Sequence, residues 1–172
     1  MIEKVCIVGN TASGKSFLAE RAGQSLGLPV FHLDQFYWRA DWTHVSRADF
    51  LQGQRGLVGR DRWVIDGCFS EFGLDGRFQA ADAVVFIDRP AWSCLRQAVA
   101  RRGKPHEGVI AGADDTKMGW GLALAFLAEI VLFPLLDRPR ILRAARRSSA
   151  RFFVVREWVE EEGLLAALQT LV

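Results

Sequence analysis

One octapeptide near the amino terminus constrains the fold of this chain more than any other feature. Residues 9–16 read GNTASGKS and match the pattern GxxxxGK[ST] at its fixed positions, which are Gly9, Gly14, Lys15 and Ser16. The apolar run at residues 5–8 precedes the octapeptide, and a helical pattern begins at Gly14. The sequence therefore predicts a phosphate-binding loop between a buried strand and the N-terminus of a helix.

Each part of this loop has a defined chemical task. The backbone N–H groups of residues 9–16, which include Asn10, Thr11, Ala12 and Ser13, would surround phosphate oxygens. Lys15 would reach the β and γ phosphates, and Ser16 would ligate Mg²⁺. Since the chain has only four lysines, a chance match is expected roughly once in several hundred sequences. We expect ATP or GTP, with Mg²⁺, as cofactors.

Composition indicates one ordinary domain over residues 1–172. Half of the residues are hydrophobic and 24% are charged, which suits a single hydrophobic core. The formal charge of +2 does not by itself favour nucleic acid. Cys6, Cys68 and Cys94 form no metal or disulfide pattern, and the first residues do not read as a signal peptide. We expect a cytoplasmic protein with free thiols.

Apolar runs alternate with helical patterns along most of the chain. Strands are predicted at residues 5–8, 29–33, 63–65, 83–87 and 152–155, and helices at 14–26, 47–58, 91–100 and 157–171. Strands separated by helices require crossover connections and hence parallel pairing. The predicted fold class is α/β, a doubly wound five-stranded parallel sheet with helices on both faces and a lid insertion.

Two segments depart from this alternation. Residues 101–119 are rich in glycine and charge, which is typical of a lid. Residues 120–136 are almost continuously apolar, but Glu129 and Pro134 interrupt them and their length is at the lower limit for a membrane span. We expect no membrane insertion, and predict a helix that is buried within one subunit or between two, so that the protein is a monomer or a homodimer.

Three aspartates are predicted at the carboxyl ends of strands, where open α/β sheets bind their ligands. These residues are Asp34, Asp66 and Asp88. Beside a phosphate-binding loop, such a carboxylate can hold Mg²⁺ or take the proton of an acceptor hydroxyl. The alternative for each is an aspartate that caps a turn or helix, and this alternative is favoured for Asp88, which precedes Pro90.

These residues resemble a known group of kinases. The P-loop, the pair Asp66-Gly67, and Asp88-x-Pro90 before a helix ending at Arg101-Arg102 are similar to adenylate and shikimate kinases. HLDQFYW, RWVIDG and RPRIL resemble small bacterial proteins known as adenylate-kinase-like or DNA topology modulation proteins, over nearly the whole chain. The resemblance implies a nucleoside-monophosphate-kinase-like P-loop fold. It also implies transfer of the γ-phosphoryl group to a small hydroxyl or phosphate acceptor, such as a nucleoside monophosphate.

The resemblance also implies roles for individual residues. Asp34 would meet the acceptor and orient or deprotonate its hydroxyl, and Asp66 and Gly67 would shape the acceptor pocket beside the metal. Arg101 and Arg102, at the base of the lid, would face phosphate and act in catalysis together with Lys15. Arg96 would stack on the adenine base.

The chain departs from the related pattern on the acceptor side. Residues 128–136 read AEIVLFPLL where relatives carry several basic residues, and DGCFS replaces DGNYS. If those basic residues bind acceptor phosphate or nucleic acid in relatives, this protein has lost that contact, or it relies on Arg138, Arg140, Arg143, Arg146 and Arg147. Of these, Arg140, Arg143 and Arg147 recur at helical spacing and can line one face. A solvated basic face is an equal alternative.

A second interpretation is a nucleotide-dependent regulatory or nucleic-acid-binding protein that uses residues 138–151 as its contact surface. Small net charge and few interleaved aromatic residues weaken this interpretation. His32, His44 and His106 show no spacing typical of a metal site or a catalytic triad, and no role is assigned to them.

Overall fold

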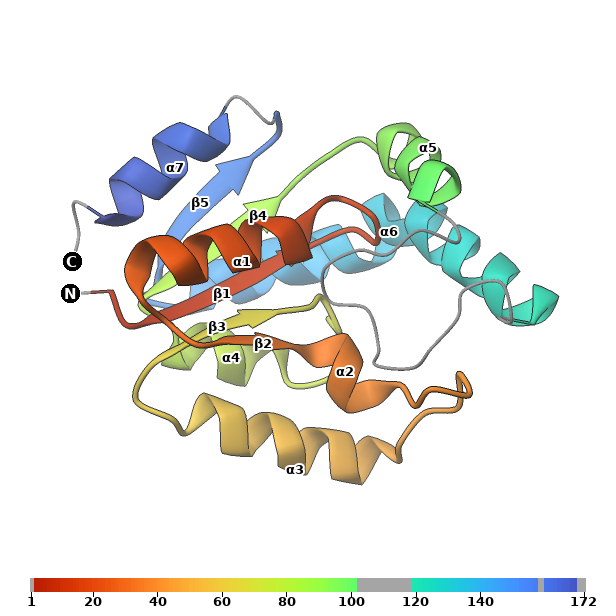
Figure 1. Cartoon of the computed structure of the whole chain (residues 1–172), viewed down its shortest axis with the longest axis horizontal. Coiled ribbons are helices and arrows are strands. Elements are labelled where there is room, and N and C mark those ends of the chain that lie inside the picture. Colours follow the sequence, from red (N-terminus) through yellow and green to blue (C-terminus); the bar gives the residue numbers. More distant parts are fainter. Residues whose placement is uncertain (1, 102–118, 158–159, 170–172) are drawn as a thin grey trace.

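The strands of the protein form one parallel sheet. The computed structural model describes residues 2–101, 119–157 and 160–169. Within these residues the strand order is β2-β3-β1-β4-β5 (Figure 1). The strands are β1 (Lys4–Gly9), β2 (Val30–His32), β3 (Trp63–Asp66), β4 (Ala83–Ile87) and β5 (Arg151–Val155). The predicted five-stranded parallel sheet is confirmed.

Helices cover both faces of this sheet. Apolar residues of α1 (Lys15–Leu26) and α7 (Glu160–Gln169) pack on one face. Those of α3 (Arg47–Val58), α4 (Leu74–Ala80) and α6 (Trp120–Arg147) pack on the other face. The short helix α2 (Leu33–Tyr37) follows β2, and α5 (Ala91–Arg101) packs against α6. This is the doubly wound arrangement that the sequence predicts.

The central strand explains its own apolar sequence. Successive side chains of a strand point to opposite faces, and in β1 Val5 and Ile7 enter one core cluster while Cys6 and Val8 enter the other. All four are fully buried. A strand covered on both faces needs apolar residues at every position, so the run at residues 5–8 has no polar alternation.

The register of the sheet brings the functional segments to one edge. His32 of β2 and Ile7 of β1 both align with Asp66 of β3, and Gly9 of β1 aligns with Ile87 of β4. Because the strands are parallel, their carboxyl ends meet at the same edge. The phosphate-binding loop and the segments after β2 and β3 therefore surround one region.

The structure differs from the predictions after β2 and after β3. Strand β2 ends at His32 and α2 begins at once, so Asp34 lies in the first turn of a helix and not at a strand end. Helix α4 follows the loop after β3 and was not predicted, because its seven residues, LDGRFQA, are too few to display helical periodicity.

Helix α6 is the largest departure from the predictions. It continues for 28 residues through Pro134 and Pro139, whereas the sequence predicts a helix that ends near residue 136. Ile130 and Phe133 are buried against the sheet, but Trp120 is 77% exposed and Leu135 is 73% exposed. The outer face of α6 is therefore not buried within one subunit, and its burial between two subunits stays a prediction.

Helix α6 is also long and apolar enough to cross a membrane, judged by length and composition alone. Of the residues in its most apolar stretch of 18, only 11% are buried. In Figure 1 the first turns of α6 extend beyond the end of the sheet. Most of the predicted lid, residues 102–118, lies outside the described residues, between α5 and α6 in the sequence.

Candidate active site

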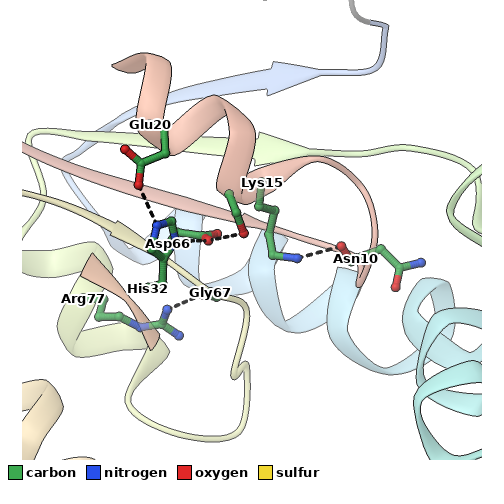
Figure 2. Close-up of polar contacts among 8 residues, drawn as sticks. Asn10, Lys15, Glu20, His32, Asp66, Gly67 and Arg77 are labelled. Carbon is green, nitrogen blue, oxygen red and sulfur yellow. Dashed lines mark hydrogen bonds and ion pairs between the residues drawn. The ribbon is translucent and has the colours of Figure 1, made fainter. Parts of the chain in front are cut away.

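The phosphate-binding loop connects β1 to α1, as predicted. Gly9 has φ 155° and Gly14 has φ 97°, and a Cβ atom at Gly9 would lie 2.6 Å from the backbone oxygen of Ile87. Only glycine fits such a close approach. Lys15 extends along the loop and donates from Nζ to the backbone oxygen of Asn10 over 2.8 Å (Figure 2). The ammonium group thus lies over the backbone that would hold phosphate.

A buried carboxylate lies beside the loop. Ser16 Oγ donates to Asp66 Oδ2 over 2.7 Å, which joins α1 to the end of β3. Asp66 is 1% exposed, and its second oxygen, Oδ1, has no hydrogen-bond partner within the described part of the chain. An orphaned carboxylate oxygen beside a hydroxyl is a fitting environment for Mg²⁺, which prefers oxygen ligands and retains several waters.

The remaining ligands of such an ion would be phosphates and water. Among residues 2–101, 119–157 and 160–169, no group of three or more His, Cys, Asp and Glu side chains forms a metal-binding cluster. This agrees with the way nucleotide-binding sites hold Mg²⁺, through one or two protein oxygens together with the substrate phosphates. Ser16 and Asp66, the two predicted metal residues, are thus brought together.

His32 links Asp66 to helix α1, and sequence reasoning missed it. Its Nδ1 lies 2.9 Å from Asp66 Oδ2 and its Nε2 lies 2.8 Å from Glu20 Oε1 (Figure 2). Burial lowers the pKa of His32, but the hydrogen bonds and negative charges of Asp66 and Glu20 outweigh this effect and raise the pKa to about 9. No local pattern in the sequence indicates this role, because the predicted strand at residues 29–33 continues past His32.

The loop after β3 is shaped by a second residue that the sequence did not reveal. Arg77 of α4 is fully buried and donates to the backbone oxygens of Gly67, Cys68 and Phe69. Phe69 has φ 36°, in the left-handed region that non-glycine residues rarely adopt. Arg77 thereby holds the backbone of residues 67–69, which lie on the predicted acceptor side of the site.

Several charged groups face the space beside the loop. Burial and the negative charges of Asp34 and Asp137 raise the pKa of Glu129, whereas Lys15 and a hydrogen bond from Thr11 lower it. Solvent also reaches Glu129, so water weakens these effects. Asp34, the predicted acceptor residue, therefore lies within electrostatic range of the same glutamate as Lys15.

The thiol of Cys68 lies near the same charges. Burial raises its pKa to about 12, with Lys15 lowering the pKa and Asp137 raising it. Cys68 is therefore a neutral thiol at physiological pH.

Helix α6 forms one wall of the site. Asn10 donates from Nδ2 to the backbone oxygen of Ile130 over 3.0 Å, and Thr11 Oγ1 donates to Glu129 Oε1 over 3.2 Å. Phe126 packs on Trp38, with ring centroids 5.6 Å apart, and on Trp42. Helix α6 therefore contacts both the phosphate-binding loop and the aromatic segment after α2.

Asp88, the third predicted aspartate, has a structural partner. Its two carboxylate oxygens each accept a hydrogen bond of 2.9 Å from Arg138 of α6. Such a bidentate pair fixes both side chains. The pair favours the non-catalytic interpretation of Asp88, and it engages the guanidinium group of Arg138.

Other predicted arginines are placed as follows. Arg96 lies over the ring of Trp92, 5.6 Å from its centroid. Arg140 pairs with Glu71 over 2.9 Å, and lines a pocket of about 220 Å³ between α4 and α6 with Arg143. Arg101 ends α5, and Arg102 lies outside the described residues. Their roles in binding nucleotide or acceptor stay predictions.

The comparisons with known proteins identify the fold. No protein-family model and no curated protein matches the sequence. Shikimate kinase from Acinetobacter baumannii, solved in complex with shikimate, superposes with a TM-score of 0.64 at 14% identity, over 99% of this chain and 93% of that chain. Shikimate kinase from Bacteroides thetaiotaomicron gives a TM-score of 0.61 at 15% identity, over 99% and 98% of the two chains.

A third solved structure agrees with these two. Shikimate kinase from Aquifex aeolicus gives a TM-score of 0.54 at 14% identity, over 98% of this chain and 94% of that chain. At such identity a shared fold does not carry function with it. The predicted P-loop α/β fold is confirmed, and the likeness to DNA topology modulation proteins stays a prediction. The chain thus has the P-loop fold that shikimate kinases also adopt.

Proposed function

We propose that this protein is a phosphotransferase that moves the γ-phosphoryl group of ATP or GTP to a small acceptor. The observation that carries the proposal is the position of Lys15 and Ser16, in a complete phosphate-binding loop, next to the buried Asp66. Many P-loop proteins bind nucleotides without transferring phosphate to a small molecule. The fold shared with shikimate kinases supports the kinase class among them.

Catalysis in such a site is mainly positioning and electrostatic stabilisation. The loop N–H groups and the N-terminus of α1 bind the phosphates. When the nucleotide binds, the ammonium group of Lys15 would give up its hydrogen bond to the backbone oxygen of Asn10 and turn to the β and γ phosphates. Mg²⁺, when bound at Ser16 and Asp66, supplies neutralisation of the charge that develops on the transferring group.

The acceptor would approach from the side of Asp34 and the loop after β3. Asp34 orients or deprotonates its hydroxyl, and Gly67 shapes the acceptor pocket together with Asp66. Arg101 and Arg102 would bind the phosphates, and Arg96 would cover the nucleotide base. Arg140 and Arg143 would serve an acceptor that carries phosphate, such as a nucleoside monophosphate.

The test is release of ADP in a coupled assay, in the presence of Mg²⁺. The acceptors to try are nucleoside monophosphates, shikimate and other small polyols, because one structural neighbour is solved with shikimate. We expect one acceptor class to stimulate turnover by wild type, and the Lys15→Ala variant to lose this stimulation by at least about 100-fold. If no compound stimulates turnover above the Lys15→Ala background, the proposal is wrong.

The alternative of nucleic-acid binding gains little support from the site. Arg140 and Arg143 share their pocket with Glu71 and Asp75, and Arg138 is paired with Asp88. These acidic partners reduce the positive charge that a nucleic-acid backbone would need. We propose a kinase that acts in the cytoplasm as a monomer or homodimer.

A further inference from the structure

We propose that His32 and Glu20 are positioning residues that hold Asp66 in the orientation required to receive Mg²⁺. The inference rests on the proposed function, because it assumes that a nucleotide binds here with its metal ion. It assigns roles to two residues that the proposed transfer does not otherwise use.

The first step concerns the orientation of the Asp66 carboxylate. Ser16 Oγ and His32 Nδ1 both point to the same oxygen, Oδ2, at 2.7 and 2.9 Å. Two donors on one oxygen fix the rotation of the carboxylate about its Cβ–Cγ bond. Since Oδ1 has no partner among the described residues, it stays available to a metal or a metal-bound water.

The second step concerns what holds His32. Its other nitrogen, Nε2, lies 2.8 Å from Glu20 Oε1. Each nitrogen of the imidazole therefore faces a carboxylate oxygen, Asp66 Oδ2 on one side and Glu20 Oε1 on the other. Glu20 therefore prevents the ring from turning away from Asp66, in the way that outer-shell carboxylates orient histidines in metal sites.

The third step concerns how the fold builds this arrangement. Ser16 and Glu20 are four residues apart in α1 and so lie on the same side of the helix. His32 and Asp66 are register partners on the neighbouring strands β2 and β3. The hydrogen bonds thus close a ring from Ser16 through Asp66 and His32 to Glu20, between one helix and two strands (Figure 2).

The ring predicts an effect on metal binding that is separate from nucleotide binding. The phosphates would contact the backbone of the loop and Lys15, whose Nζ donates to Asn10, whereas the ring reaches the loop through the side chain of Ser16. Loss of the ring should therefore lower the affinity for Mg²⁺ and leave the affinity for metal-free nucleotide nearly unchanged. A merely structural role would lower both affinities together.

The experiment measures binding of a fluorescent ATP analogue to the full chain. Nucleotide affinity is determined in EDTA, and Mg²⁺ is then titrated into the nucleotide complex. For His32→Ala we expect the apparent Mg²⁺ affinity to fall about 10- to 100-fold, as for other outer-shell partners, with the affinity in EDTA within about twofold of wild type. His32→Asn, which keeps a donor near the position of Nδ1, should recover most of the loss.

Two further variants keep the test decisive. Glu20→Gln retains the size of the side chain but removes its charge, and it should also lower the Mg²⁺ affinity. This variant serves as the test if His32→Ala does not fold. Gln24→Ala, at an exposed position one turn further along α1, is the matched control and should match wild type. Two results would overturn the inference. One is an unchanged Mg²⁺ affinity in folded His32 and Glu20 variants, and the other is an equal fall in the Mg²⁺ affinity and in the nucleotide affinity measured in EDTA. Failure of wild type itself to bind nucleotide would instead disprove the proposed function.

Discussion

The side-chain amide of Asn10, in the phosphate-binding loop, donates to the backbone oxygen of Ile130, in the middle of α6, over 3.0 Å. In an unbroken helix that oxygen would accept from the N–H of residue 134. Residue 134 is a proline and has no N–H. Pro134 thus leaves a buried helical carbonyl without its usual donor, and Asn10 takes the place of that donor.

This relationship predicts that Asn10 and Pro134 are energetically coupled. Asn10→Ala should lower the free energy of unfolding by about 1–3 kcal/mol, because it leaves the Ile130 oxygen buried without a donor. In a Pro134→Ala background the helix supplies its own N–H, so the same change should cost less. Urea denaturation of the two single variants and the double variant measures the coupling, and strictly additive effects would contradict it.

Gly67 should not accept a side chain. It has φ 138°, and a Cβ atom there would lie 2.8 Å from Leu33 Cβ, next to His32 and Asp34. Gly67→Ala should lower the free energy of unfolding by about 1–3 kcal/mol. Gly56→Ala is the matched control, since Gly56 lies inside α3 with open space around it, and should be neutral or stabilising by up to about 1 kcal/mol. Equal effects of the two substitutions on thermal denaturation would refute this account.

Asp66 and Asp88 should respond differently when each is replaced by asparagine. Asp88 accepts both hydrogen bonds of Arg138, whose side chain is 40% exposed, so Asp88→Asn should cost about 1 kcal/mol or less of stability and leave nucleotide binding unchanged. Asp66→Asn should instead weaken Mg²⁺-dependent binding. Titration of nucleotide with and without Mg²⁺ distinguishes the two variants, and loss of Mg²⁺ dependence in Asp88→Asn would show that Asp88 also takes part in metal binding.

His32 predicts a pH dependence of stability for the metal-free protein. Its pKa rises from 6.5 to about 9 on folding, so the folded chain holds this proton more tightly than the unfolded chain. The resulting stabilisation is complete below pH 6.5 and is lost as pH rises through about 9. It amounts to at most about 3 kcal/mol, and to less because Glu20 is 39% exposed.

Chemical denaturation across this range measures the effect. Between pH 6.5 and 9 the free energy of unfolding of wild type should fall more than that of His32→Asn. Parallel curves for the two proteins would show that His32 has no raised pKa.

The elements that could be predicted are those whose conformation depends on residues close together in the sequence. Helix α3 and strand β4 begin and end where their patterns predict, at Arg47–Val58 and Ala83–Ile87. The phosphate-binding loop follows from eight residues, because its conformation depends on glycines at fixed positions. The pairing of Ser16 with Asp66 was also predictable, since both follow strands whose carboxyl ends meet.

The parts that were not predicted depend on partners distant in sequence. Helix α6 was expected to end near residue 136, where its apolar run ends. It continues through Pro134, and the donor that compensates for this proline is Asn10, 120 residues away. Nothing in the neighbourhood of His32 or Arg77 reveals a role. The role of His32 appears only when the β2–β3 register places it against Asp66, and that of Arg77 when α4 places it beneath the loop.

The central claim is that Lys15, Ser16 and Asp66 form the phosphoryl-transfer site, and transfer from γ-labelled ATP tests it most directly. Wild type, Lys15→Ala and Asp66→Asn are each incubated with Mg²⁺, labelled ATP and the acceptor panel, and labelled products are separated from ATP and inorganic phosphate. We predict a labelled acceptor with wild type, dependent on Mg²⁺, and a loss of at least about 100-fold in both variants. No labelled acceptor with wild type, or equal labelling by Lys15→Ala, would contradict the claim.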